Sequence, residues 1–202
     1  MSEWIKIAAV VLTLDEEPNI KDCLKQLKPF VDHIVVVDGG SKDKTVEIAR
    51  KYAHTVRVRE RVGSFADERN YGWSLVPPET KWVLFVDADE RFNLNFLRGM
   101  RELLSRIDAL AFRFPRANLP KLVRYPDWQV RLLKNDGQLE WRRWKGSLHD
   151  VPYSKELNVP VDRCGTACLT LIEYPIYHML RREELNREWW STEGGDKNEE
   201  KN

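Results

Sequence analysis

Acidic side chains follow three separate apolar segments within the first ninety residues. Asp15 comes after the first segment, Asp38 ends the second, and Asp87 and Asp89 come directly after the last. Carboxylates that converge on one place repel one another unless a cation or a hydrogen-bonding ligand compensates their charge. A hard divalent cation does so, because it prefers oxygen ligands and keeps coordination positions for phosphate. A single aspartate at a strand end more often caps a turn or a helix, but three such clusters favour a site for a cation and a phosphorylated ligand.

The segments that end in these acids alternate with helical patterns. The sequence predicts strands over residues 5–12, 33–37, 55–58 and 82–86, and helices over residues 19–27, 45–52, 65–75 and 95–105. Near-continuous apolar strands that alternate with helices are typical of a parallel sheet covered on both faces. Right-handed crossovers bring the carboxyl ends of such strands to one edge, where open sheets of this class bind ligands. We therefore expect an α/β fold that gathers the acidic clusters at one edge of its sheet.

The second half of the chain has a different pattern. Short strands are predicted over residues 109–114, 129–134 and 139–144. Asn135-Asp136-Gly137 separates the last two and predicts a hairpin turn, since these residue types tolerate positive φ. A further helix is expected over residues 181–190. Residues 191–202 lack apolar side chains and are expected to be disordered.

Composition narrows the class of protein. The chain has 202 residues, with 33 lysines and arginines against 32 aspartates and glutamates, so its net charge of +1 gives no reason to expect a nucleic acid as partner. No apolar stretch approaches the ~20 residues of a membrane span. The N-terminus does not resemble a secretory signal, and three cysteines are too few for a disulfide framework. We expect a soluble globular protein of the cytoplasm, or one held peripherally at the inner face of a membrane.

Several short motifs, in order along the chain, resemble glycosyltransferase family 2, a group of inverting enzymes with the GT-A fold. The matching segments are Thr13–Ile20, Val35–Thr45, Phe65–Gly72, Val86–Glu90, Asp127–Leu133, Leu139–Arg142, Leu148–Asp150 and Ile176–His178. The fourth segment contains an Asp-x-Asp sequence similar to the DxD motif of the family. The chain has Asp15 where the family usually has Asn, and Asp150 where it usually has Glu. Each motif alone is of moderate specificity, but their shared order makes the resemblance strong.

The resemblance implies an architecture and a reaction. We expect a GT-A, Rossmann-like, mostly parallel sheet with helices on both faces and a small antiparallel acceptor-side subdomain. Residues 1–106 would bind a nucleotide sugar, and residues 107–190 would form the acceptor-side half of the same domain. The implied reaction is metal-dependent transfer of a sugar, by a single displacement with inversion, from a nucleoside-diphosphate sugar to a hydroxyl group. A UDP-sugar is the favoured donor, and the acceptor is a glycan, a lipid-linked saccharide or a protein.

The same resemblance assigns roles to individual residues. Asp89 and His178 would hold Mn²⁺ or Mg²⁺, and Asp150 would be the general base that takes the proton of the acceptor hydroxyl. Asp127 and Glu140 are rival candidates for that base. The nucleotide-binding residues would be Thr13, Glu17, Asp38, Gly39, Arg69 and Asp87, and the acceptor-binding residues Trp128, Arg131 and His149. By the same resemblance, Asp38 would accept a hydrogen bond from the imide N–H of a base such as uracil, because an ionised carboxylate only accepts hydrogen bonds.

Residues 111–145 are basic and contain interleaved aromatic side chains. Nine arginines and lysines stand against three acidic residues there, together with Tyr125, Trp128, Trp141 and Trp144. Aromatic faces stack on sugar rings, and arginines bind phosphate. An acceptor with both groups, such as a lipid-linked saccharide, or an anionic membrane surface would suit this segment. A hairpin with solvated arginines over a tryptophan core explains the same pattern.

Three other functions are compatible with parts of the sequence. A sugar-nucleotide-binding module without turnover would keep the same motifs. A nucleotidyltransferase would share this kind of sheet, but it is expected to have a glycine-rich phosphate loop near the start. A phosphatase with an aspartyl nucleophile would use an Asp-x-Asp sequence on an early strand, whereas here three strand–helix units precede Asp87.

Overall fold

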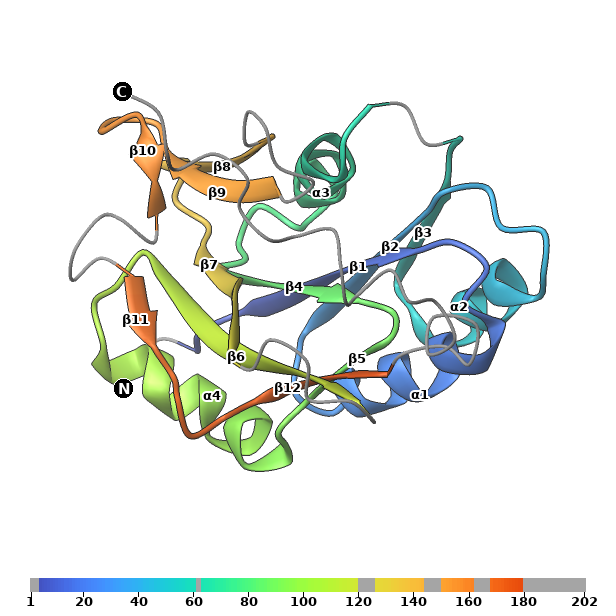
Figure 1. Ribbon diagram of the computed structural model, residues 1–202, viewed down its shortest axis with the longest axis horizontal. Helices are drawn as coiled ribbons and strands as arrows, with labels where there is room; N and C mark the ends of the chain where they lie inside the picture. Colours follow the sequence, from blue (N-terminus) through green and yellow to red (C-terminus); the bar gives the residue numbers. More distant parts are fainter. Residues whose placement is uncertain (1–3, 61–62, 120–125, 144–149, 162–167, 180–202) are drawn as a thin grey trace, which may run out of the picture.

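The computed structural model describes residues 4–60, 63–119, 126–143, 150–161 and 168–179 (Figure 1). The helices are α1 (Glu17–Leu27), α2 (Thr45–Tyr52), α3 (Phe65–Ser74) and α4 (Leu94–Arg106). The strands are β1 (Ile7–Thr13), β2 (His33–Asp38), β3 (Thr55–Val58), β4 (Trp82–Asp87), β5 (Glu90–Phe92), β6 (Ala111–Leu119), β7 (Asp127–Lys134), β8 (Leu139–Arg143), β9 (Asp150–Ser154), β10 (Val159–Pro160), β11 (Cys168–Thr170) and β12 (Ile176–Met179). The helix expected over residues 181–190 and the tail 191–202 lie outside the described residues. Every described helix is too short or too polar to cross a membrane.

One large sheet contains most of the strands, in the order β3-β2-β1-β4-β7-β6-β12-β5, with β11 paired to β6. β1 runs parallel to both β2 and β4, and β2 runs parallel to β3. The register places Thr13 beside Asp38 and Leu12 beside Asp87. The carboxyl ends of β1, β2 and β4 therefore share one edge of the sheet, as the sequence predicted.

Alternate side chains of the central strands enter two apolar cores. Ile7, Ala9 and Val11 of β1 pack in a core with buried residues of α1, α2 and α4. Val10 of β1 packs in a second core with α3 and with residues of the small antiparallel sheet, which has the order β10-β9-β8. Figure 1 shows α3 beside β8 and β9, across the large sheet from α1, α2 and α4. Because both faces are covered, the central strands are apolar along almost their whole length.

Local sequence explains where the helices begin. Ser64 and Asp67 form a capping box at the start of α3. Asn93 caps α4 by accepting hydrogen bonds from the next backbone N–H groups. Pro18 occupies the first turn of α1, where no intrahelical N–H is needed. These starts hold the helices that follow the strand ends in fixed positions at the edge of the sheet.

The predicted hairpin between the strands at 129–134 and 139–144 is wrong. Gly137 does adopt a positive φ of 82°, but β7 lies between β4 and β6 in the large sheet, while β8 pairs with β9 in the small one. Asn135 explains the separation, since its amide donates to the Thr80 carbonyl oxygen and its side-chain oxygen accepts from Trp73 Nε1. These bonds hold the turn against α3 and the segment that follows it. The chain therefore leaves the large sheet instead of folding back along β7.

Gly72 lets α3 pack closely on the large sheet. A Cβ atom at this position would lie 2.5 Å from Val10 Cγ1 and 3.1 Å from Val37 Cγ2. At Gly99, on the exposed face of α4, a Cβ atom would meet nothing within 4 Å.

We therefore expect opposite effects on stability from alanine at these two glycines. Gly72→Ala should lower the free energy of unfolding by about 1–3 kcal/mol, because the core holds Val10 in place. Gly99→Ala, the matched control, should raise it by about 0.5–1 kcal/mol through better helix propensity. Urea unfolding of both variants measures the difference, and a stabilised Gly72→Ala would contradict the close approach.

Candidate functional site

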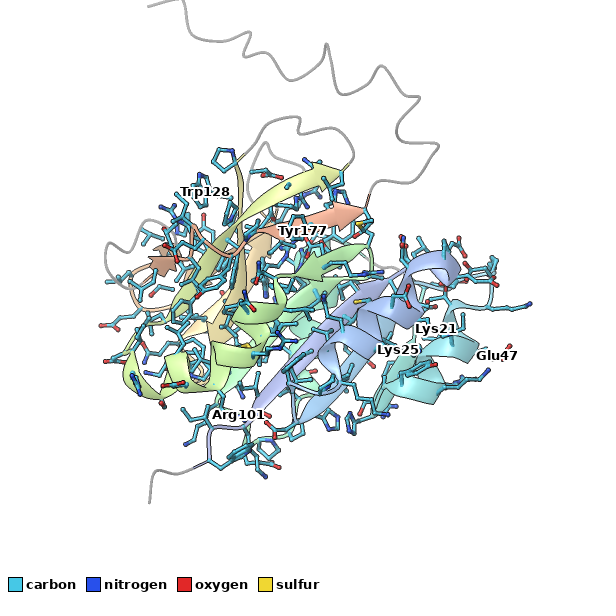
Figure 2. All side chains as sticks on the ribbon, turned by 90° about the horizontal axis from the view of Figure 1, so that it is seen from below. Lys21, Lys25, Glu47, Arg101, Trp128 and Tyr177 are labelled. Carbon is cyan, nitrogen blue, oxygen red and sulfur yellow. The ribbon has the colours of Figure 1, made fainter. Side chains whose placement is uncertain are left out.

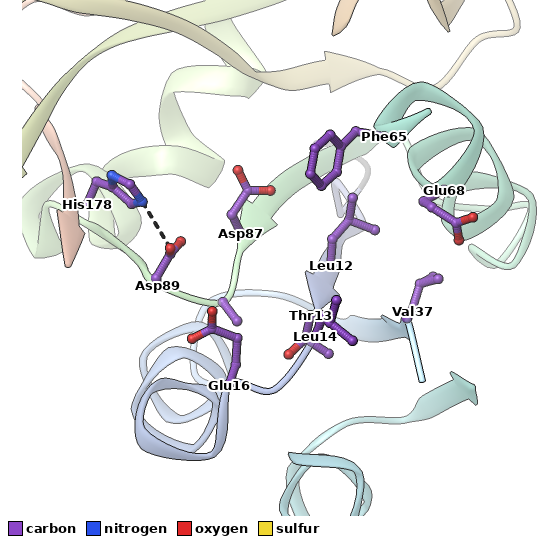
Figure 3. Close-up of a pocket in the computed structure, with 12 residues that line it drawn as sticks. Leu12, Thr13, Leu14, Glu16, Val37, Phe65, Glu68, Asp87, Asp89 and His178 are labelled. Atoms are coloured by element: carbon purple, nitrogen blue, oxygen red, sulfur yellow. Dashed lines mark hydrogen bonds and ion pairs between the residues drawn. The ribbon is translucent and has the colours of Figure 1, made fainter. Parts of the chain in front are cut away.

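A cavity of about 380 Å³ lies at the carboxyl edge of the parallel strands. Its walls come from the ends of β1, β2 and β4, from α3 and from β12 (Figure 3). The lining residues are Leu12, Thr13, Leu14, Glu16, Val37, Gly39, Phe65, Glu68, Asp87, Ala88, Asp89 and His178. Of the residues predicted from the sequence, the cavity brings together Thr13, Gly39, Asp87, Asp89 and His178.

His178 and Asp89 meet because β12 pairs with β5, directly after the Asp-x-Asp sequence. His178 Nε2 lies 2.9 Å from Asp89 Oδ2, and His178 Nδ1 lies 2.8 Å from Asn118 Oδ1. Burial lowers the pKa of His178, but the hydrogen bond and the charge of Asp89 outweigh it and hold the pKa above its ordinary value. A protonated imidazole can donate to both oxygens at once. The pair is therefore fixed in orientation at one side of the cavity.

The other oxygen of Asp89 is available to a cation. Asp89 Oδ1 is buried and accepts no hydrogen bond from the residues that the structure describes. Mg²⁺ is commonly bound through one or two carboxylates, with water and substrate phosphates as its remaining ligands. Within the described ranges, no group of three or more histidine, cysteine or acidic side chains could enclose an ion alone. The carboxylate oxygen that Asp89 offers therefore suits a cation whose remaining ligands come from the phosphates of a substrate.

Asp87 is held by two buried arginines. Arg131 Nη2 lies 2.8 Å from Asp87 Oδ2, and Arg69 Nη2 lies 3.1 Å from Asp87 Oδ1. Burial raises the pKa of Asp87, but the charges of Arg131 and Arg69 outweigh it and lower the pKa to about 2. The carboxylate is therefore ionised and already balanced. Such a group is better suited to accept hydrogen bonds from ligand hydroxyls than to hold a cation alone.

Glu90, which the sequence patterns did not single out, completes this network. Its carboxylate is fully buried and accepts hydrogen bonds from Arg131 Nε at 2.9 Å and Arg131 Nη2 at 2.8 Å. Arg116 Nη1 lies 3.6 Å from the same carboxylate. A three-residue strand such as β5 is too short to show a periodic pattern. Only the tertiary structure reveals that Glu90 of β5 contacts Arg131 of β7.

Asp38 lies within the turn that follows β2. Its side chain is fully buried; Oδ1 accepts from the backbone N–H groups of Gly40 and Ser41, and Oδ2 accepts from the Ser41 hydroxyl. Gly40 has a φ of +95°, which glycine adopts without strain. The carboxylate therefore shapes a turn whose Gly39 lines the cavity.

Asp15 and Glu17 connect the loop after β1 to the loop after β2. The Asp15 carboxylate accepts a hydrogen bond from the Lys42 backbone N–H, and the Glu17 carboxylate accepts one from the Lys44 N–H. Asp15 has a positive φ of 52°, a conformation that both Asn and Asp adopt more readily than most residues. Both residue types therefore fit the backbone conformation at that position. Glu17 is not among the cavity-lining residues, whereas its neighbour Glu16 is.

Asp150 begins β9 in the small sheet, next to α3. Its carboxylate accepts a hydrogen bond from the Ala66 backbone N–H in the first turn of that helix. Burial raises the pKa of Asp150, and the opposing effects of this hydrogen bond and of the nearby Arg69 and Arg143 charges do not cancel the rise. Asp150 Oδ2 is buried and has no hydrogen-bond partner in the described part of the chain. Among the described residues, Asp150 Oδ2 is therefore a free acceptor oxygen.

The structure separates the residues expected to bind the acceptor. Trp128 is partly exposed on β7, with the Arg113 guanidinium 5.3 Å from the centre of its ring. Figure 2 shows Trp128 on the far side of the molecule from the labelled lysines of α1, and it is not among the residues that line the cavity. Arg131 is buried in the network with Asp87. His149 lies outside the described residues.

Known proteins share both motifs and fold with this chain. The model of glycosyl transferase family 2 matches residues 8–158. The chain is 30% identical over 135 residues to an uncharacterized glycosyltransferase of Rickettsia bellii, an alignment that covers 66% of this chain and 40% of that protein. It is 29% identical over 107 residues to a TPR repeat-containing protein of Synechococcus elongatus, covering 53% of this chain and 26% of that protein. The chain thus spans between 26% and 40% of the length of these curated relatives.

A solved structure has the same architecture. The crystal structure of a mycobacterial protein aligns with a TM-score of 0.62 at 16% sequence identity, covering 88% of this chain and 68% of that chain. At this level of identity the likeness shows a common fold.

Proposed function

The chain belongs to glycosyl transferase family 2, and we propose that it transfers a sugar from a nucleoside-diphosphate sugar to a hydroxyl group, in one displacement that inverts the anomeric carbon. The large sheet covered by helices on both faces, with a small antiparallel sheet beside α3, confirms the GT-A fold that the sequence predicted.

The composition of the cavity is the observation that supports this proposal most. A free oxygen of Asp89 and the ionised Asp87 lie in one space with the apolar side chains of Leu12 and Phe65. The free oxygen suits a cation with its phosphates, and the ionised carboxylate suits sugar hydroxyls. The apolar walls suit a planar ring. A metal-bound sugar nucleotide has these three parts.

Asp89 would hold Mn²⁺ or Mg²⁺ together with phosphate oxygens of the donor. His178 would join it through Nε2 in the neutral form of the ring, with Nδ1–H donating to Asn118 and the hydrogen bond to Asp89 given up. When bound, the cation supplies positive charge that stabilises the departing diphosphate. Asp89 contributes its free Oδ1, while Asn118 orients the His178 ring beside it. Arg131 and Arg69 keep Asp87 ionised, so that it accepts hydrogen bonds from the donor.

Asp150 is the proposed general base. In a single displacement, the acceptor oxygen attacks the anomeric carbon opposite the leaving diphosphate and loses its proton as it does so. The free Oδ2 of Asp150 receives that proton, and the Ala66 N–H holds the other side of the carboxylate in place. The rivals for this role, Asp127 and Glu140, form ion pairs with neighbouring arginines.

Outside the cavity, Trp128 and Arg113 form a separate surface that suits the part of an acceptor carrying both sugar and phosphate. The exposed ring of Trp128 offers a face for a sugar, and the Arg113 guanidinium beside it offers a charge for phosphate. A lipid-linked saccharide has this chemistry.

The proposal is tested by incubating the full chain and Mn²⁺ with labelled nucleoside-diphosphate sugars that differ in base. We expect release of nucleoside diphosphate, slowly onto water and faster with an acceptor. Asp89→Ala should abolish this release and the Mn²⁺-dependent thermal stabilisation by the donor. Asp108→Ala, which removes an exposed carboxylate, should change neither.

Other products would contradict the proposal in distinct ways. Formation of nucleoside triphosphate and sugar 1-phosphate from the donor when pyrophosphate is added would indicate a nucleotidyltransferase, and inorganic phosphate from a simple phosphoester would indicate a phosphatase. Thermal stabilisation by the donor without any turnover would indicate a binding module.

A further inference from the structure

Glu68 is a buried carboxylate that accepts no hydrogen bond within the described part of the chain. The residue is 4% exposed and lies on the side of α3 that lines the cavity. Neither Oε1 nor Oε2 accepts a hydrogen bond from any residue in the described ranges. Arg59 Nε lies 3.6 Å from Oε2, close enough to balance the charge but too far to hydrogen-bond. Burying a carboxylate costs free energy unless a partner donates a hydrogen bond to it. The environment of Glu68 therefore favours a bound ligand that has N–H or O–H groups.

Glu68 lies at the opposite side of the cavity from the proposed cation site. Figure 3 shows Asp89 and His178 on one side, Asp87 between, and Glu68 on the other. A nucleoside diphosphate has its phosphates at one end and its base at the other. If the phosphates lie near Asp89, as the proposed function requires, the base lies near Glu68.

Two other polar residues, Thr13 and Asp38, lie side by side at the ends of β1 and β2. Asp38 is fully buried, and both of its carboxylate oxygens already accept hydrogen bonds within the turn after β2. Thr13 Oγ1 is buried and has no hydrogen-bond partner among the residues described. As far as the described residues show, Glu68 and Thr13 therefore keep unpaired polar atoms that can meet the edge of a base.

Apolar side chains at the same end provide faces for a planar ring. Leu14 and Phe65 both line the cavity, and each is about two-fifths exposed. Figure 3 shows that Phe65 and Glu68 come from the same helix, with Leu14 approaching from the end of β1. A ring in contact with these apolar groups can turn its polar edge toward Glu68.

We infer that Glu68 recognises the nucleobase of the donor and that this base is guanine, an assignment that rests on the proposed function. An ionised carboxylate only accepts hydrogen bonds. Guanine presents two adjacent donors, the N1–H and the 2-amino group, which match the two carboxylate oxygens side by side. Uracil presents a single N3–H between two carbonyl oxygens, one of which would face and repel the second carboxylate oxygen. Adenine and cytosine each place a ring-nitrogen acceptor next to their amino group, with the same consequence.

Calorimetric titration of the full chain in the presence of Mn²⁺ tests the assignment with GDP, inosine diphosphate and UDP. We expect GDP to bind at least about tenfold more tightly than UDP, because an unmatched carboxylate oxygen loses a charge-assisted hydrogen bond. Inosine diphosphate should fall between them, since it keeps the N1–H of guanine but lacks the 2-amino group. This comparison uses the unaltered protein and does not depend on the folding of any variant.

Glu68→Gln provides an independent test, because the amide replaces one acceptor oxygen with a donor. The variant should lose the preference for GDP and prefer xanthosine diphosphate, whose base has a carbonyl oxygen where guanine has the amino group. A purely structural role for Glu68 would not produce this exchange. Glu47→Gln is the matched control, because Glu47 is exposed on α2, and it should leave all affinities unchanged.

The outcomes separate this inference from the proposed function. Equal or tighter binding of UDP, or a Glu68→Gln variant with the same base preference as the unaltered chain, would overturn the guanine assignment alone. Failure of every nucleoside diphosphate to bind in the presence of Mn²⁺ would overturn both.

Discussion

Asp150→Asn should lower the rate of sugar transfer by about 10²–10⁴-fold, because an amide cannot take the proton of the acceptor hydroxyl. Donor affinity should change little, since Asp150 is not among the residues that line the cavity. Single-turnover transfer measures the first quantity, and calorimetry with the nucleoside diphosphate measures the second. A near-normal transfer rate would reject Asp150 as the base.

The pH dependence of transfer provides a second signature of the same group. Burial raises the pKa of Asp150 above its ordinary value, and a base acts only in its ionised form. The rate should therefore fall as the pH drops through this raised pKa, so the inflection should lie above the ~3.9 of an unperturbed aspartate. That inflection should be absent from the residual activity of Asp150→Asn.

The two rival carboxylates are the matched controls. Asp127 accepts hydrogen bonds from Arg116, and Glu140 accepts one from Arg142. Asp127→Asn and Glu140→Gln should therefore cost less than about tenfold in transfer rate, well below the effect of removing a general base. A larger loss in either variant than in Asp150→Asn would move the base to that residue.

Arg131→Met should lower the free energy of unfolding by about 3–5 kcal/mol, because removing one partner of a buried ion pair leaves the others uncompensated. Arg131 is 3% exposed and its guanidinium lies 2.8 Å from both the Asp87 and the Glu90 carboxylates. Methionine fills a similar volume but provides no donor. Urea unfolding at neutral pH measures the loss.

An exposed ion pair serves as the control for this variant. Arg106→Met breaks a pair with Glu102 on the outer face of α4, where both side chains are mostly exposed, and should change stability by less than about 1 kcal/mol. If Arg131→Met has an equally small effect, the buried network does not stabilise the fold.

The pH dependence of stability should also change in Arg131→Met. The lowered pKa of Asp87 contributes stability above the ordinary pKa of aspartate, and this contribution is lost as the pH falls toward about 2. Without Arg131, that pKa should rise toward its ordinary value. The acid-dependent loss of stability attributable to Asp87 should then be smaller than in the unaltered chain.

Local patterns were enough to predict the first four strands and the helices between them. The ranges 45–52 and 55–58 coincide with α2 and β3, and the other predicted boundaries there differ by at most two residues. Continuous apolar strands indicate burial on both faces, and the fixed hand of the crossovers brings their ends to one edge. Asp38 and Asp87 could therefore be placed at the same edge before any contact was known.

The second half was harder to predict because its strands are short and their partners are distant. β5, β10 and β11 have only two or three residues each, which is too few for an alternating pattern. The turn at Asn135 has the residue types of a hairpin, yet its hydrogen bonds to Trp73 and Thr80 direct the chain into another sheet. Turn chemistry specifies the local bend but not the strand that lies next to it.

The amino-acid sequence by itself indicated the family, the class of sheet and the sheet edge at which the acidic side chains gather. Three-dimensional packing decided which of those acids are still free to bind a ligand. Arg131 neutralises Asp87 and the turn after β2 occupies Asp38, while Glu68 is buried without a hydrogen-bond donor among the residues that the structure describes. The physical reason is that hydrogen bonds and ion pairs join segments far apart in the chain, so their partners depend on strand order and register and not on any local pattern.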